Sequence, residues 1–437
     1  MKKAALHNLG CKVNAYETEA MQQLLEQSGY EIVKFTDKAD VYIINTCTVT
    51  NIADRKSRQM LHKAKKMNPS AIVIATGCYA QASKEQLELD ESVDIVVGNN
   101  KKKDIIHILN EYENNIEIDN VIDINHTDEY EELELDSSFE HTRANIKVQD
   151  GCNQFCSYCI IPFARGRVRS RKSRNVISEI ERLANKGFKE VVLTGIHLSS
   201  YGVDLENENL LSLIVAVSKV EGIKRIRLGS LEPRIITEEF AQTLASIEKM
   251  CPHFHLSLQS GCDATLKRMN RKYSATEYYE TCKLLRKYFD NPAITTDVIV
   301  GFPGETEEEF EITKEFVEKI NFYEMHIFKY SKRQGTKAAT MENQVDEQVK
   351  NVRSTKLLEI TSKQSDEFVN TQIGKEMQVL IEEKVMIEGT QYYLGHSKEY
   401  VKTLIRNNEE LENKIINCVG KNLIEHNKIM AEIKNIK

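Results

Sequence analysis

Short apolar runs that alternate with helical stretches constrain the fold of this chain most. In the first third such runs stand at residues 41–47, 71–78 and 94–98, and a basic helical pattern at 54–66 separates the first two. Strands that are apolar throughout are typical of a parallel sheet covered by helices on both faces. The sequence therefore predicts an α/β fold that begins with a doubly wound parallel sheet.

A second series of the same kind fills the middle of the chain. It opens with "ANIKVQDGC", and five further strand candidates follow at residues 190–195, 225–229, 253–259, 294–301 and 324–330. Helical patterns separate these candidates, so the series predicts a partial barrel of six strand–helix units, shorter than the closed eight-unit form. Ligands of such folds usually lie at the carboxyl ends of the strands.

The remaining chain predicts a third unit. A charged helical pattern at residues 344–368 comes before strand-like pieces such as "EMQVLIEEK" and "YVKTLI", which indicate a small C-terminal β-barrel of a size that binds nucleic acid. The expected order is an N-terminal α/β domain (1–110), an acidic connector (111–140), the partial barrel (141–370) and the β-domain (371–437).

Charge is unevenly distributed. The net charge is -7, but residues 111–140 hold twelve Asp or Glu and no Lys or Arg, so the rest of the chain sums to +5. A polyanionic partner is therefore permitted. The acidic segment lacks periodicity, and we expect a hairpin-like or loose connector there. No apolar stretch is as long as a bilayer span, so we expect a cytoplasmic protein without membrane contact.

Three cysteines stand within eight residues after the first barrel strand. Cys152, Cys156 and Cys159 have the spacing Cys-x3-Cys-x2-Cys, whereas a structural zinc ion normally takes four protein ligands. Three thiolates on a four-iron cluster leave one iron free to bind a substrate or cofactor. The spacing favours an iron–sulfur cluster, and a zinc site completed by a distant residue is the alternative.

Three more cysteines are scattered over the first domain. Cys11, Cys47 and Cys78 each fall at or just past the predicted carboxyl end of a strand. Because the carboxyl ends of parallel strands share one edge, these residues can converge in space. Singly, each also fits a buried small apolar residue, and that is the interpretation for the four isolated cysteines Cys251, Cys262, Cys282 and Cys418.

The motifs resemble one family across nearly the whole chain. The cluster Cys152, Cys156 and Cys159, with Tyr158 before the last cysteine, resembles the signature of radical S-adenosylmethionine enzymes. The stretches "NLGCKVNAYETE", "INTCTVT" and "ATGCYAQ" are similar to the amino-terminal domain of the methylthiotransferases, which carry a second four-iron cluster on three cysteines. The resemblance implies two 4Fe-4S clusters, S-adenosyl-L-methionine and a reduced electron donor.

The stretches "LTGIHLSSYG", "HLSLQSGCDATLKRMNRKYS" and "TTDVIVGFPGETEEEF" resemble the barrel strands and loops of the same family. The resemblance implies adenosylmethionine contacts at the strand ends and assigns no catalytic residue. One departure is Gly229, where the family more often has a serine. The contacts so implied are Thr194, Gly195, Ser257, Gln259, Asp297 and Gly301.

A basic run follows the cysteine loop directly. "ARGRVRSRKSR" holds Arg165, Arg167, Arg169, Arg171, Lys172 and Arg174. A solvated helix start is the ordinary explanation of such a run. Guanidinium groups suit phosphate oxygens, however, and this charge is tethered to the cysteine loop, so we expect it to bind RNA. Residues 371–437 resemble the TRAM-like RNA-binding β-domain of the family.

Lys12, Val13 and Tyr16, which stand around Cys11 and Asn14, resemble one branch of the family. That branch inserts a methylthio group at C2 of N6-threonylcarbamoyladenosine next to the anticodon of tRNA. Two relatives remain as alternatives, acting on isopentenyladenosine in tRNA or on a ribosomal-protein aspartate. A more distant alternative is a zinc- and RNA-binding protein without enzymatic activity.

Overall fold

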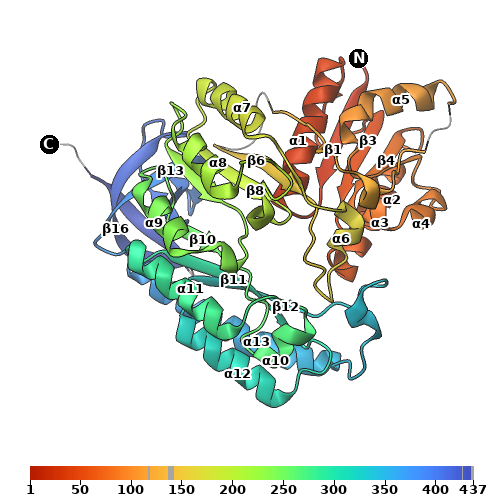
Figure 1. The fold of residues 1–437 in the computed structure, drawn as a ribbon. Coiled ribbons are helices and arrows are strands. Elements are labelled where there is room, and N and C mark those ends of the chain that lie inside the picture. Colours follow the sequence, from red (N-terminus) through yellow and green to blue (C-terminus); the bar gives the residue numbers. More distant parts are fainter. Residues whose placement is uncertain (117–118, 136–141, 426, 435–437) are drawn as a thin grey trace.

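The computed structural model describes residues 1–116, 119–135, 142–425 and 427–434. Figure 1 shows an N-terminal α/β domain and a C-terminal β-barrel on opposite sides of a central barrel domain. No helix in these ranges is both long and apolar enough to cross a membrane.

The N-terminal domain is a five-stranded parallel sheet with the order β2-β1-β3-β4-β5. One apolar core packs α2 against one face of the sheet, and a second core packs α1 and α5 against the other. The predicted doubly wound sheet is therefore confirmed. Its elements are β1 (Lys3–Asn8), α1 (Lys12–Gln27), β2 (Glu31–Ile32), β3 (Val41–Thr46), α2 (Asn51–Met67), β4 (Ile72–Gly77), α3 (Cys78–Ala82), α4 (Lys84–Glu88), β5 (Ile95–Val97) and α5 (Ile105–Glu113).

Six parallel strands and the short antiparallel β7 form the central domain. Two sheets, β7-β6-β8-β9 and β10-β11-β12, are joined by bridges such as Ile226 to Met250, which confirms the partial barrel. The strands are β6 (Arg143–Asp150), β7 (Arg169–Ser170), β8 (Glu190–Gly195), β9 (Arg225–Leu228), β10 (His253–His255), β11 (Ala293–Val300) and β12 (Glu324–Lys329). The helices are α6 (Ile161–Arg165), α7 (Ser173–Asn185), α8 (Leu210–Ser218), α9 (Glu238–Ser246), α10 (Asp263–Arg268), α11 (Ala275–Tyr288), α12 (Glu307–Ile320) and α13 (Glu347–Asn370).

The strand predicted at residues 253–259 is shorter than expected. Regular pairing ends at His255, and a single bridge joins Gln259 to Val298. Gln259 has a φ of +70°, in the left-handed region that extended strands do not use. The chain therefore leaves the sheet at the carboxyl end of the barrel, where the predicted ligand contacts lie.

Alternating side chains give the barrel two different faces. Ala144, Ile146 and Val148 of β6 pack into the helix-covered apolar core. The alternate residues Lys147 and Gln149 point to the other side, because successive side chains of a strand face opposite ways, and both are buried. The interior of the barrel is consequently polar, which suits a ligand-binding site.

The C-terminal domain is a closed five-stranded barrel with the order β13-β14-β15-β17-β16, as predicted. Arg225 of β9 donates to the carbonyl oxygens of His396 (3.0 Å) and Gln378 (2.6 Å), so the domain is docked on the central barrel. Its strands are β13 (Glu376–Ile387), β14 (Thr390–Ser397), β15 (Lys402–Ile405), β16 (Ile415–Glu425) and β17 (Lys428–Ile433).

Part of the acidic connector is packed rather than loose. Leu133 and Leu135 are buried together with Tyr16 and Ala20 of α1, and Tyr16 donates its hydroxyl hydrogen bond to the carbonyl of Leu133. In residues 132–135 buried leucines alternate with exposed acidic residues, and this stretch, here called the strap, lies along α1. Residues 117–118 and 136–140 of the connector lie outside the described residues.

Candidate active site between two cysteine trios

The N-terminal trio gathers where three neighbouring strands end. Cys11 lies three residues after β1, Cys47 follows β3 directly, and Cys78 opens α3 after β4. A Cβ on Gly10 would lie 3.1 Å from the sulfur of Cys47, so a larger residue there would crowd the thiol. The charges of Cys78 and Cys11 both act on Cys47. The three thiols therefore share one space, as the strand ends predicted.

The second trio lies on the loop between β6 and α6. The N–H of Cys152 donates to the carbonyl of Gly166, and that of Cys159 donates to Cys156, both at 3.0 Å. Phe155 adopts a φ of +48°, which turns the loop between the first two cysteines. The charges of Cys156 and Cys152 both act on Cys159, so these thiols also converge.

Burial raises the pKa of four of the thiols, and neighbouring sulfurs raise it further; these are Cys11, Cys47, Cys152 and Cys159. The pKa is raised to about 12 for Cys47 and Cys159 and to about 11 for Cys152. Metal ligands must be thiolates, so a metal centre has to displace these protons when it binds.

The spacing of the sulfurs bears on which metal fits. Among the described residues, one trio of possible ligands, His255, Asp297 and His326, has its ligand atoms within 4.8 Å of one another, and neither cysteine trio meets that limit. A single zinc ion needs closely gathered ligands, whereas an iron–sulfur cluster is larger than one ion and takes thiolates at separate irons. The cysteines therefore fit clusters better than single ions.

An arginine accompanies each trio, buried at Arg165 and partly buried at Arg271. Arg165 donates from Nε to the sulfur of Cys78 at 3.2 Å, and Arg271 donates from Nη1 to the sulfur of Cys156 at 3.3 Å. Arg271 was not singled out in the sequence, although it stands in the stretch "RMNRKYS". A fixed guanidinium stabilises negative charge on sulfur at short range, so both sites favour bound thiolate.

One cavity of about 210 Å³ joins the two cysteine-bearing domains. Val49 and Thr50, just after Cys47, line it together with Tyr158, the neighbour of Cys159. Gln259 and Asp297 of the barrel contribute polar groups to its lining, as do Lys329 and Ser331. Chain segments beside both trios thus face the same space.

Two models of known protein families match the two cysteine-bearing domains. Residues 3–98 match the model of the Uncharacterized protein family UPF0004, and residues 146–317 match that of the Radical SAM superfamily. The threonylcarbamoyladenosine tRNA methylthiotransferase MtaB of Bacillus subtilis (strain 168) is 42% identical over 419 residues, covering 95% of this chain and 93% of that protein. The protein of the same name from Aquifex aeolicus (strain VF5) is 44% identical, covering 92% and 97%.

The chain belongs to the radical S-adenosylmethionine methylthiotransferase family. A second kind of relative is also close: the tRNA-2-methylthio-N(6)-dimethylallyladenosine synthase of Clostridium novyi (strain NT) is 38% identical, covering 87% of this chain and 86% of that protein. Among solved structures, the radical S-adenosylmethionine methyltransferase TsrM from Kitasatospora setae shares the fold, with a TM-score of 0.59, 16% identity and 77% coverage of each chain.

The methylthiotransferase brings only some of the predicted adenosylmethionine contacts to the shared cavity. Gln259 and Asp297 line it. Gly301 instead faces α13: its N–H donates to Glu305 at 2.6 Å, and a Cβ there would lie 2.2 Å from the side chain of Lys350. Thr194, Gly195 and Ser257 stand at neighbouring strand ends outside the cavity lining, with Gly195 packed against Gln149.

Half of the basic run is turned inward, which corrects the prediction that Arg165, Arg169 and Arg171 contact RNA. Arg165, Arg169 and Arg171 are each 0% exposed. Arg165 pairs with Glu17 and Asp150, and Arg171 pairs with acidic residues of the connector and of α7. A buried cation must be paired within the protein, so these three side chains are not available to contact RNA.

The other three members of the run are not buried. Lys172 and Arg174 are exposed and Arg167 is half-buried, with its guanidinium 4.6 Å from the ring of Phe155 on the cysteine loop. These three residues stay candidates for RNA contact.

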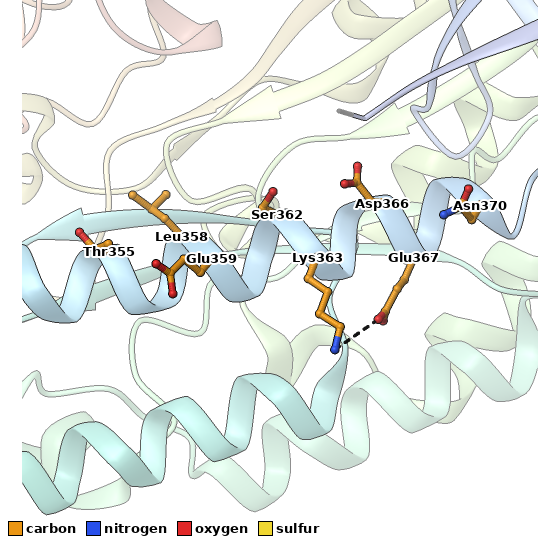
Figure 2. A pocket seen from close by; sticks show the side chains of 8 residues that line it. All are labelled: Thr355, Leu358, Glu359, Ser362, Lys363, Asp366, Glu367 and Asn370. Carbon is orange, nitrogen blue, oxygen red and sulfur yellow. Dashed lines mark ion pairs between the residues drawn. The ribbon is translucent and has the colours of Figure 1, made fainter. Parts of the chain in front are cut away.

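A larger cavity lies away from this chemistry. About 670 Å³ of space runs along α13 and is lined by side chains of that helix (Figure 2). Its charged side chains include Lys363 and Glu367, which pair with each other at 3.8 Å. None of the described residues that line this groove is a cysteine, and the smaller cavity remains the candidate active site.

Proposed function

We propose that this methylthiotransferase inserts a methylthio group at C2 of N6-threonylcarbamoyladenosine next to the anticodon of tRNA. The observation that carries the proposal is the shared cavity, because residues next to Cys47 and next to Cys159 line the same 210 Å³. Two relatives named for this substrate are 42% and 44% identical to the chain, against 38% for the Clostridium novyi relative named for dimethylallyladenosine. Two further relatives named for threonylcarbamoyladenosine are also 38% identical.

The residues of the chain fit two 4Fe-4S clusters. Cys152, Cys156 and Cys159 would hold the cluster that binds adenosylmethionine, and Cys11, Cys47 and Cys78 would hold the one that presents sulfur. When bound, these groups supply radical chemistry, which acts on a carbon–hydrogen bond that acids and bases leave untouched.

The protein's own contribution is positioning and exclusion of water. Tyr158 packs edge-on against Phe302 at 6.3 Å, and Phe302 packs against Tyr330 at 5.5 Å, so aromatic rings wall one side of the cavity. Gln259 and Asp297 supply polar groups that can orient a nucleoside or adenosylmethionine. Lys172, Arg174 and Arg167 would hold the RNA backbone outside.

Mass spectrometry of tRNA nucleosides tests the proposal. We expect a strain without the gene to lose the 2-methylthio derivative of N6-threonylcarbamoyladenosine and to regain it from a plasmid copy. A loss confined to isopentenyladenosine, or to a ribosomal peptide, would replace the proposed substrate by that alternative. Anaerobically purified protein should contain about eight iron and eight sulfide per chain, whereas bound zinc without iron would contradict the cluster assignment.

A further inference from the structure

Three side chains that can bind a metal stand on neighbouring strands of the barrel. His255 ends β10, Asp297 lies in β11 and His326 lies in β12. Asp297 is directly opposite His326 in the sheet, and His255 is opposite Thr295, two residues before Asp297. Residues two apart in a strand point to the same face, so all three side chains share one face. We call them the His-Asp-His trio.

The His-Asp-His trio faces the interior of the barrel. Phe254 and Met325, which precede His255 and His326 in sequence, belong to the helix-covered core on the other face. Asp297 lines the cavity of about 210 Å³ together with Ile299 and Phe328. These two residues stand one step nearer the carboxyl ends of β11 and β12 than the trio. The trio is therefore the layer of side chains directly below the candidate active site.

A second space gives the trio access to solvent. His326 is exposed and lines a groove of about 450 Å³, together with Leu358 and Ser365 of α13. A metal site needs such an entry path. An ion from solvent can therefore reach the trio at His326.

The ligand atoms of the trio are close enough for a single ion. All three lie within 4.8 Å of one another, and Nε2 of His255 is 3.3 Å from Oδ2 of Asp297. An ion pair is the ordinary explanation, but a charge-assisted hydrogen bond is usually about 2.7–2.9 Å long. Two ligands that are each about 2.0–2.1 Å from a tetrahedral zinc ion lie about 3.3 Å apart. The observed separation fits two ligands of one metal ion better.

One histidine is already oriented as a ligand. Nδ1 of His255 lies 3.0 Å from the hydroxyl oxygen of Thr295, which is buried. A partner on one ring nitrogen fixes the orientation of the imidazole and leaves the other nitrogen to bind the metal. The rings of His255 and His326 stack at 5.8 Å with an angle of 23° between their planes, so the second imidazole lies beside the first.

We propose that His255, Asp297 and His326 bind one divalent transition-metal ion at the base of the active-site cavity. Two imidazoles and one carboxylate suit Zn²⁺ or Fe²⁺. Three protein ligands leave one position open, and that position can take water or an oxygen atom of a bound nucleoside. A carboxylate has two oxygens, so Asp297 can bind the ion through one and keep a cavity contact through the other. This ion is separate from the two clusters, and the inference does not depend on which nucleoside is the substrate.

Metal analysis of the holoenzyme tests the site. Anaerobically prepared enzyme with both clusters is dialysed against micromolar zinc chloride, and its metals are counted by inductively coupled plasma mass spectrometry. We expect about eight iron and about one zinc per chain. His326→Ala removes an exposed ligand and should lose the zinc while keeping the iron. X-ray absorption at the zinc edge should show nitrogen and oxygen ligands at about 2.0–2.1 Å and no sulfur near about 2.3 Å.

His107→Ala is the matched control. His107 of α5 is also exposed and pairs with a carboxylate, Glu111, at 2.9 Å, but it has no third ligand among the described residues. This variant should keep its zinc. Zinc retained by His326→Ala, sulfur ligands at the zinc, or wild-type enzyme without zinc would each overturn the site. Unchanged iron content and circular dichroism of His326→Ala show that the loss of zinc comes from folded protein.

Discussion

Arg165 shows how closely the first domain and the barrel depend on each other. Its guanidinium lies next to the sulfur of Cys78 and also bonds to Asn14 at 2.6 Å. Glu17 of α1 and Asp150 of β6 hold it in place, and both carboxyls have a lowered pKa because, although burial alone would raise it, the surrounding cations outweigh that effect. One arginine therefore fixes the N-terminal trio against the end of the first barrel strand.

Single cysteine substitutions separate the roles of the two trios. We expect Cys156→Ala to abolish cleavage of adenosylmethionine, measured as 5′-deoxyadenosine, because it removes a ligand of the cluster that binds the cofactor. Cys11→Ala should still cleave adenosylmethionine but form no methylthio product. Each variant should retain about four of about eight iron per chain.

Cys282→Ala is the control for these variants, since Cys282 is fully buried in the apolar core of the barrel domain. It should keep both activities and the full iron content. Methylthio product from Cys11→Ala at the wild-type rate would refute the division of roles.

At the scale of elements, the acidic connector packs against α7 and meets the basic run at Arg171. Arg171 bonds to Glu132 of the strap at 2.8 Å, and Arg182 of α7 bonds to Glu134 at 2.6 Å. Glu179 of α7 also pairs with Arg171. One arginine of the basic run therefore joins the connector to α7, and only the outer part of the run faces solvent.

The exposed part of the run predicts a salt-dependent RNA contact. We expect Lys172→Gln/Arg174→Gln to weaken tRNA binding and to reduce the slope of log affinity against log salt concentration by about two, roughly one for each phosphate that the variant no longer neutralises. Anisotropy titrations at several salt concentrations measure both effects.

Lys186→Gln/Lys219→Gln removes the same charge from exposed residues that follow α7 and α8, at the amino ends of the strands. This control should leave the slope unchanged. An equal change in both double variants would mean that the run attracts RNA only through net charge.

At the scale of the whole molecule, the flanking domains complete the open barrel. Residues beyond β12 contact the first turn of α2: Arg333 donates to Asn51 at 2.7 Å and pairs with Asp54 at 2.7 Å, and Ser331 accepts from the N–H of Asn51. On the other side α1 lies against β6 through Glu17 and Lys147, at 2.8 Å. The N-terminal domain therefore spans from one edge of the barrel to the other, over the cavity.

Glu190 links the barrel to the C-terminal domain and predicts a pH effect. Burial alone would raise the pKa of Glu190, but Arg227 and Arg143 lower it overall. Its contribution to stability is therefore present above the pKa of an unfolded glutamate, about 4.3, and is lost as the pH falls through the lower folded value. Glu190→Gln should cost about 3 kcal/mol near neutral pH, because it leaves buried arginines unpaired.

Denaturant unfolding at several pH values measures this contribution. The gap in stability between wild type and Glu190→Gln should shrink as the solution is acidified below about pH 4. Glu239→Gln, at an exposed position of α9, should stay within about 0.5 kcal/mol of wild type at each pH. A gap that widened in acid would contradict the lowered pKa.

The sequence by itself determined the elements and predicted the cluster ligands. Strand and helix periodicity predicted both parallel units and the small β-barrel, and the positions of Cys11, Cys47 and Cys78 after strands predicted that they meet at one edge. These features depend on local patterns and on the rule that the carboxyl ends of parallel strands share one edge, so the sequence alone predicts them.

Only the tertiary structure decided which charged side chains are buried and with which partners they pair. Arg165 and Arg171 look like a surface run in the sequence, yet each is buried because carboxylates from other segments, Glu17 and Glu132, reach it across the fold. Pairing of charges is non-local and depends on which surfaces are desolvated together, and periodicity carries no information about that.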